Sequence, residues 1–198
     1  MNITNPYAQA GWSSSGNSNG SAPPPSIFGA LPWFSEDSDP SSSISLHLFN
    51  PDILNSTLMG PQSRPYFRVI NNAPSRDFTL IQNRDGGSVA IIEWRESGAV
   101  VEVRDIIRKQ LVSTWLPLSG DQKYRFMNAR DRTMVWVPKN ELVELYTYGT
   151  TTPELYARIG SQREGKITLE ISSTAMQIGL LECCVVAAIL LRSGRIID

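Results

Sequence analysis

Short runs of alternating apolar and polar residues recur from residue 44 onward. The first is Ile44-Ser45-Leu46-His47-Leu48, in which every second side chain is apolar, the pattern of a strand with one buried face. Further runs rich in β-branched and aromatic residues follow, separated by turn residues: Tyr66–Ile70, Phe78–Gln82, Val89–Trp94, Val100–Arg104, Leu111–Trp115, Lys123–Met127, Thr133–Val137, Leu142–Tyr146, Glu154–Ile159 and Lys166–Ile171. With no helical segment between them, these runs predict an antiparallel sandwich or barrel.

One segment near the C-terminus has a different pattern. Residues 175–191 are apolar on every face except at Gln177 and Glu182, and Ser172, Ser173 and Thr174 precede them as candidate N-caps. A helix of this length would span about 26 Å, which is short for a bilayer core of roughly 30 Å. Lipid would also penalise the central carboxylate. We therefore expect the helix to be buried inside the barrel, with insertion in a membrane as the alternative.

The N-terminal residues 1–43 are rich in Ser, Pro and Gly and include Pro23-Pro24-Pro25. This composition is typical of a disordered arm, so we expect a division into an arm, residues 1–43, and a barrel-like domain, residues 44–198. Within the arm, the apolar island Ile27–Phe34 is either a motif for a partner or a segment that packs on the domain. The first residues resemble neither a secretory nor a mitochondrial signal, which predicts a cytoplasmic protein that is not secreted.

Charge and rare residues exclude several classes of function. The net charge is −1, and the first basic residue is Arg64, so residues 1–63 carry −4 and residues 64–198 carry +3. No nucleic-acid partner is expected from this balance. One histidine, His47, and the adjacent Cys183 and Cys184 are too few for a zinc site or a disulfide framework, and no cofactor is expected. His47 is far in sequence from the cysteines, and no phosphate-binding loop is present, so we expect no enzyme activity.

Arginine usage is the strongest hint of a ligand. The chain has fourteen Arg and four Lys, and a guanidinium can bind a phosphate or a carboxylate with two donors at once. Our candidates for an anion or lipid-headgroup site lie on predicted strand faces and turns: Arg104, Arg108, Lys109, Lys123 and Arg125. Arg130 and Arg132 also lie near a predicted turn. The alternative is an ordinary solvated surface in which Arg and Glu pair across strands.

Several motifs resemble a fungal family known only as a domain of unknown function. They occur in the same order over roughly residues 64–192: Pro65–Ile70, Val89–Trp94, Val101–Arg104, Trp115–Pro117, Tyr124–Phe126, Trp136, Leu142–Leu145, Ala157–Ile159 and Leu169–Ile171. That family is similar to the tubby C-terminal and LURP-one-like folds, in which an antiparallel barrel encloses a hydrophobic C-terminal helix, an architecture that phospholipid scramblases share. The resemblance implies this fold and no chemistry.

These observations together predict a mostly β, tubby-like barrel with one central helix. The function we expect is a non-catalytic intracellular module that binds an unidentified protein or an anionic phospholipid, at most peripheral to membranes. The alternative is a membrane-attached, scramblase-like protein with its C-terminal helix in the bilayer.

Overall fold

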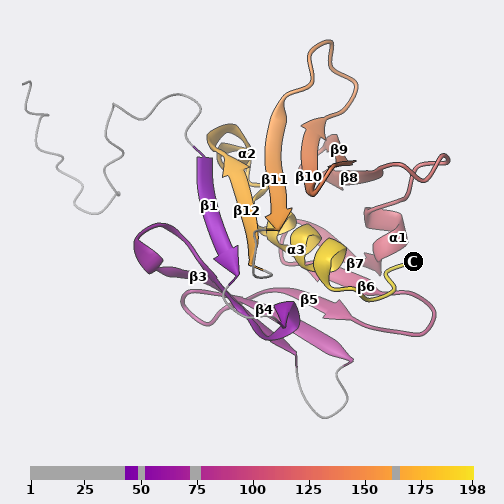
Figure 1. Ribbon diagram of the computed structural model, residues 1–198. Coiled ribbons are helices and arrows are strands. Elements are labelled where there is room, and N and C mark those ends of the chain that lie inside the picture. Colours follow the sequence, from indigo (N-terminus) through magenta and orange to yellow (C-terminus); the bar gives the residue numbers. More distant parts are fainter. Residues whose placement is uncertain (1–42, 49–51, 72–76, 162–165) are drawn as a thin grey trace, which may run out of the picture. The chain divides into compact units, whose positions relative to one another are not determined.

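A computed structural model describes residues 43–48, 52–71, 77–161 and 166–198 (Figure 1). The predicted arm, including the island Ile27–Phe34, lies outside the described residues apart from Ser43, which begins the first strand. All other described residues belong to the predicted domain.

Within the described ranges, twelve strands form a single antiparallel sheet. They are β1 Ser43–Leu48, β2 Thr57–Met59, β3 Pro65–Asn71, β4 Phe78–Asn83, β5 Ser88–Glu93, β6 Val100–Val103, β7 Ile107–Leu111, β8 Arg125–Ala129, β9 Arg132–Lys139, β10 Leu142–Thr147, β11 Leu155–Ser161 and β12 Ile167–Ser172. The helices are α1 Val112–Trp115, α2 Ser173–Gln177 and α3 Leu181–Arg192, and two short 3₁₀ turns, Ile53–Asn55 and Pro61–Ser63, flank β2.

The sheet closes on itself everywhere except at one seam. Each strand pairs with its neighbour in sequence, and β1 pairs with β12 along its whole length, from Ser43↔Ser172 to Leu48↔Ile167. The exceptions are β7 and β8, which are consecutive in the chain and form the two edges of the sheet. The result is a nearly closed β-barrel whose opening lies between β7 and β8, which confirms the predicted fold class.

Part of the seam is filled by α1 and the segment that follows it. The indole Nε1 of Trp115 donates to the carbonyl of Asn128 on β8 at 3.1 Å, and the amide of Phe126 donates to the carbonyl of Pro117 at 3.0 Å. These two hydrogen bonds satisfy backbone groups on the edge of β8 that would otherwise be unpaired. On the other edge, a register shift opposite Val101–Val103 breaks the regularity of β7. Both edges are thereby made poor templates for a further strand.

The predicted helix over residues 175–191 is two helices. Ser172 caps α2 by accepting from the amide of Ala175 at 3.2 Å. The chain then turns at Gly179, whose φ is +74°, with the amide of Leu180 donating to the carbonyl of Ala175 at 3.0 Å. This is the Schellman arrangement that ends a helix at a glycine. The sequence pattern did not reveal the break because the apolar residues continue across it.

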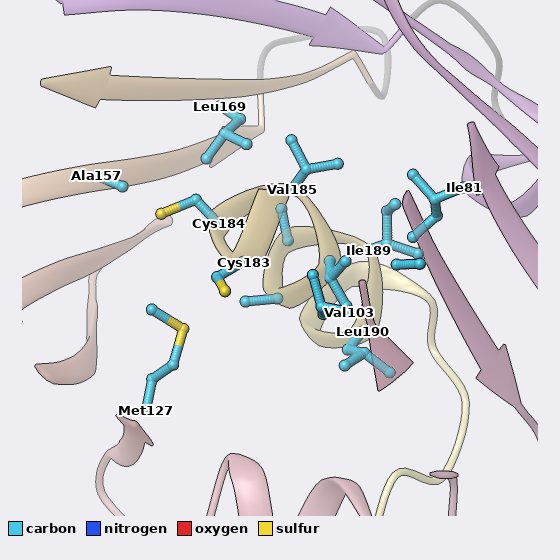
Figure 2. Packing of buried hydrophobic residues seen from close by; sticks show 14 of the residues in the cluster. Ile81, Val103, Met127, Ala157, Leu169, Cys183, Cys184, Val185, Ile189 and Leu190 are labelled. Atoms are coloured by element: carbon cyan, nitrogen blue, oxygen red, sulfur yellow. The ribbon is translucent and has the colours of Figure 1, made fainter. Parts of the chain in front are cut away.

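The second helix, α3, fills the interior of the barrel (Figure 1). Its residues from Cys183 to Ala188 are at most 1% exposed, and Figure 2 shows them among side chains of the surrounding strands, including Ile81, Met127 and Leu169. Twelve residues span about 18 Å. In the part of the chain that the structure describes, no helix is long and apolar enough to cross a membrane. Glu182 lies half-buried in the first turn of α3, at the end of the barrel where the helix begins.

The structure corrects several strand assignments. Leu111–Trp115 is the end of β7 followed by the turn of helix α1, and the sequence pattern missed both β2 and β7. On β8, strand alternation and apolarity together would place Tyr124 and Phe126 on the core face and Arg125 on the solvent face. Met127 and Ala129 are instead buried, so Arg125 shares their inward face while Phe126 and Asn128 point outward. The ring of Phe126 contacts Tyr124 and Tyr148 edge to face on the outer surface.

Candidate functional site

The five basic residues predicted to bind an anion do not form one surface. Arg104 lies in the β6–β7 turn and Arg108 on β7, and both are exposed. Neither guanidinium makes a hydrogen bond or an ion pair with any residue that the structure describes. These two residues therefore remain available for a ligand.

Lys109, Lys123 and Arg125 are already engaged by carboxylates. Lys109 pairs with Glu93, which Arg95 also contacts, and the hydrogen bond from Lys109 is the main reason that the pKa of Glu93 lies below its usual value. Lys123 Nζ lies 3.6 Å from Asp121. Arg125 Nη1 donates to the carbonyl of Leu116 at 2.9 Å and to Asp198 Oδ1 at 2.8 Å.

The topology separates Arg104 from Lys123 and Arg125. Lys123 and Arg125 precede or begin β8, beside α1, whereas Arg104 follows β6 at the opposite end of the β6–β7 hairpin. The β8–β9 turn, Arg130-Asp131, lies at the same end as Arg104, because β8 runs away from α1. The available cations are thus found at the end of the barrel where α3 begins.

A pocket opens at this end of the seam. Its volume is about 370 Å³, and it lies between the β6–β7 turn and the β8–β9 hairpin. The lining residues are Ile106, Ile107, Asn128, Ala129, Arg130, Asp131, Arg132 and Thr133. Two of them are arginines, and Arg104 and Arg108 are within two residues of Ile106 and Ile107 in the chain. We call this site the seam pocket.

The two residues of the β8–β9 turn have an unusual backbone conformation. Ala129 pairs with Arg132, and the residues between them, Arg130 and Asp131, have φ values of +51° and +57°. Two positive φ angles are what a tight turn between twisted strands needs, and Asn-Gly is the usual sequence for it. An L-residue with a side chain costs about 1–2 kcal/mol in this conformation. The sequence therefore keeps Arg-Asp at a position where turn stability favours other residues.

The guanidinium groups of Arg130 and Arg132 are unpaired. Both residues are exposed, and neither makes a hydrogen bond or an ion pair with the described parts of the chain. Asp131 also lines the pocket, so the charged lining residues sum to +1. The site can attract an anion, and every donor of the two guanidiniums is free to bind one.

The polar cluster around Glu144 is a network of hydrogen bonds within the barrel. Glu144 on β10 is 2% exposed, and it accepts from Tyr146 at 2.6 Å and from Arg158 Nε at 2.8 Å, with Lys139 Nζ 3.6 Å away. The hydrogen bond from Tyr146 is the main reason that the pKa of Glu144 is lowered, and the same bond raises the pKa of Tyr146. Three side chains of the described residues therefore engage this buried carboxylate.

The residues considered for catalysis are placed apart. His47 on β1 contacts the hydroxyl of Thr168 at 3.2 Å, while Cys183 and Cys184 lie in the core. Burial raises the pKa of the Cys183 thiol to about 12 and that of Cys184 well above its usual value, so neither is a ready nucleophile. Among the described residues, no three His, Cys, Asp or Glu side chains are grouped so that they could hold a metal.

Arg130 and Arg132 were a sequence signal for the seam pocket, although neither was among the five candidate ligand residues. Arg130 and Arg132 stand two apart beside a predicted turn, but the pattern could not show that this turn faces the β6–β7 turn across an open seam. Strand alternation was also unable to detect the carboxylates that engage Lys109 and Arg125, because Glu93 and Asp198 are distant in sequence.

Comparisons with known proteins identify a family and leave the chemistry open. Residues 51–195 match a family described as "Family of unknown function (DUF6593)". A comparison with curated proteins gives no match. Among solved structures, the X-ray structure of the Arabidopsis thaliana protein AT5G01750 is similar, with a TM-score of 0.43 and 14% identity over 78% of this chain and 97% of that one.

Proposed function

The chain belongs to the DUF6593 family, whose description gives no activity, and we propose from the seam pocket that it is a non-catalytic module that binds an anionic phospholipid headgroup. The sequence predicted either a protein partner or an anionic lipid, and the proposal selects the lipid headgroup and places it in the seam pocket. It retains Arg104 and Arg108 of the sequence-based candidates and adds Arg130 and Arg132.

One observation carries the proposal: two arginines with no partner line the same pocket. Unpaired arginines on a convex surface are ordinary, but here both belong to one short hairpin and border a volume of about 370 Å³. That volume is near the lower end of the range for small-ligand sites, roughly 300–1,000 Å³. A phosphate group offers several oxygens to the two guanidinium forks, so a headgroup of modest size suits both the volume and the donors.

Arg104 and Arg108 contribute in a different way. They stand on the β7 side of the seam, whereas Arg130 and Arg132 belong to the β8–β9 hairpin. A basic residue close to an anionic membrane contributes about 1 kcal/mol, and salt weakens that contribution. Asp105 and Asp131, on the same two turns, reduce the attraction. We therefore expect binding that is measurable at low salt and weaker at physiological salt.

Vesicle sedimentation tests the proposal. The vesicles contain phosphatidylserine or phosphatidylinositol phosphates, and the binding of the wild-type protein is compared with that of an Arg130→Gln, Arg132→Gln double variant. Loss of charge-assisted hydrogen bonds from two guanidiniums should weaken binding at least about tenfold. Asp131→Asn should strengthen binding, because it removes a negative charge from the pocket wall.

A matched control separates the pocket from general charge. Arg64→Gln, Arg84→Gln removes two unpaired arginines from the β2–β3 and β4–β5 turns, at the same end of the barrel but outside the pocket lining. This control should bind vesicles more tightly than the Arg130→Gln, Arg132→Gln variant, because it loses only a general charge contribution and keeps the pocket donors. If the wild type does not bind at low salt, or if both double variants bind equally, the seam pocket is not a headgroup site, and a protein partner becomes the leading hypothesis.

A further inference from the structure

The position of Arg130 depends on a residue from another part of the fold. Gly179 lies in the link between α2 and α3, about fifty residues further along the chain, and it faces the Arg130 side chain. A methyl carbon built on Gly179 would lie 3.3 Å from Arg130 Nε and 3.6 Å from Nη2. The guanidinium therefore lies against the bare backbone of the link, and a methyl group at residue 179 would push it away by a few tenths of an ångström.

This packing holds Arg130 without using its hydrogen-bond donors. The guanidinium forms no hydrogen bond or ion pair with the described residues, and it lies in contact with Gly179 beside a turn whose backbone has positive φ angles. The electrostatic effect of Arg130 on the Cys183 thiol, in the first turn of α3, agrees with a guanidinium held at the start of the central helix. An arginine positioned in this way keeps its donors free for a ligand, and its side chain loses less rotamer freedom when the ligand binds.

Backbone conformation alone gives a competing reason for the glycine. Gly179 has φ +74° at the C-terminal end of α2, where glycine is the usual residue for the left-handed conformation. Gly194 follows α3 in the same way, with φ +68°, and has no heavy atom within 4 Å of the methyl position. The two glycines carry a similar backbone requirement, and they differ in that only Gly179 touches an arginine.

We infer that Gly179 is a positioning residue for the seam pocket, because its missing side chain lets the Arg130 guanidinium lie against the α2–α3 link and face the ligand. This inference rests on the proposed function for its consequence, although the contact itself does not. It assigns the α2–α3 link, which precedes the central helix, a part in ligand binding, because the binding arginine rests on this link.

Two variants with the same backbone cost test the inference. Gly179→Ala and Gly194→Ala should lower the melting temperature to a similar extent. Only Gly179→Ala should shift the Arg130 Nε–H resonance in a ¹⁵N spectrum of the full chain, since only there does the new methyl group meet the guanidinium. An unshifted resonance in Gly179→Ala would overturn the inference without reference to any ligand.

Binding is measured on the same variants with phosphatidylserine vesicles and, separately, with inorganic phosphate as a competitor. Gly179→Ala should weaken vesicle binding about tenfold, the loss of one charge-assisted hydrogen bond, while Gly194→Ala leaves it unchanged. In an Arg130→Gln background, Gly179→Ala should have no further effect. Competition by phosphate identifies the phosphate group as the recognised chemistry, whereas its absence assigns recognition to the rest of the headgroup.

The outcomes distinguish the two proposals. If the wild type fails to bind vesicles but the Arg130 resonance shifts, the packing is real and the proposed function is wrong. If the wild type binds and Gly179→Ala binds as well as Gly194→Ala, the seam pocket stands and Gly179 serves only the backbone.

Discussion

Arg125 and Asp198 join the start of β8 to the C-terminal segment. Arg125 Nη1 lies 2.8 Å from Asp198 Oδ1, and a second contact joins Nη2 to Oδ2, so the guanidinium binds the carboxylate with two donors. The Arg125 side chain is only 14% exposed, and its other acceptor is the carbonyl of Leu116. An arginine that the sequence suggested as a ligand residue thus fastens the end of the chain to the barrel.

The Arg125–Asp198 pair should make stability depend on acid pH. The hydrogen bond from Arg125 lowers the pKa of Asp198 below its ordinary 3.8, so the pair stabilises the fold at neutral pH, and this contribution disappears as the pH falls through the lowered pKa. Because Asp198 is half-exposed, we expect Asp198→Asn to cost only about 0.5–1 kcal/mol at pH 7. Urea titrations at pH 7 and pH 3 measure this difference, and a cost that does not shrink at pH 3 would contradict the assignment.

The native residues of the β8–β9 turn should support vesicle binding and lower the free energy of unfolding. Arg130→Asn, Asp131→Gly gives the turn its preferred residues and should raise the free energy of unfolding by about 1–2 kcal/mol. The same change should weaken vesicle binding, because the loss of the Arg130 guanidinium outweighs the removal of the Asp131 charge. Asn140→Gly, in the β9–β10 turn where Asn140 has φ +56°, is the control: it relieves a left-handed residue without touching the pocket. A turn variant that is more stable and binds vesicles as tightly as the wild type would exclude Arg130 from the site.

The Glu144 cluster should matter for folding and not for binding. Glu144→Gln weakens hydrogen bonds from Tyr146 and Arg158 to a buried group, so we expect a loss of about 2 kcal/mol, and about 1 kcal/mol for Tyr146→Phe. Since the pKa of Glu144 is lowered, its contribution is present above its ordinary value of 4.5 and is lost as the pH falls below it. Chemical denaturation at pH 7 and pH 4 checks both points. Unchanged stability in Glu144→Gln at pH 7 would show that these hydrogen bonds do not stabilise the barrel.

The two cysteines should be unreactive in the native protein. Both side chains are fully buried in α3, and burial disfavours the thiolate that reacts with labelling reagents. Modification should require unfolding, so its rate should rise steeply with denaturant. Rapid labelling of Cys183 or Cys184 without denaturant would show that the barrel does not enclose α3.

The N-terminal arm remains a sequence-based prediction. The first described strand, β1, begins at Ser43, and residues 1–42 lie outside the described part of the chain. A shortened protein that begins at Pro40 keeps all of β1 and should melt cooperatively within a few degrees of the full chain. A large drop in the melting temperature would show that the island Ile27–Phe34 supports the fold.

Much of the fold could be predicted because strand alternation and apolar continuity are local properties. Leu46 and Leu48 alternate with polar neighbours and are buried on β1, and Cys183–Ala188 are apolar on every face and fill the core. Phe126 is an exception, an apolar residue that lies outside. In a short strand either face satisfies the alternation rule, and only the packing of Met127 and Ala129 selects one.

The sequence by itself determined that this chain forms an antiparallel β domain with an apolar C-terminal helical segment, and that arginine is far more frequent than lysine. Only the tertiary structure decided which arginines are free. Pairing such as Arg125 with Asp198, or Lys109 with Glu93, depends on how strands and chain ends meet in space. The seam pocket likewise exists because β7 and β8, although consecutive in the chain, do not pair. A local sequence pattern cannot show that two consecutive strands remain unpaired.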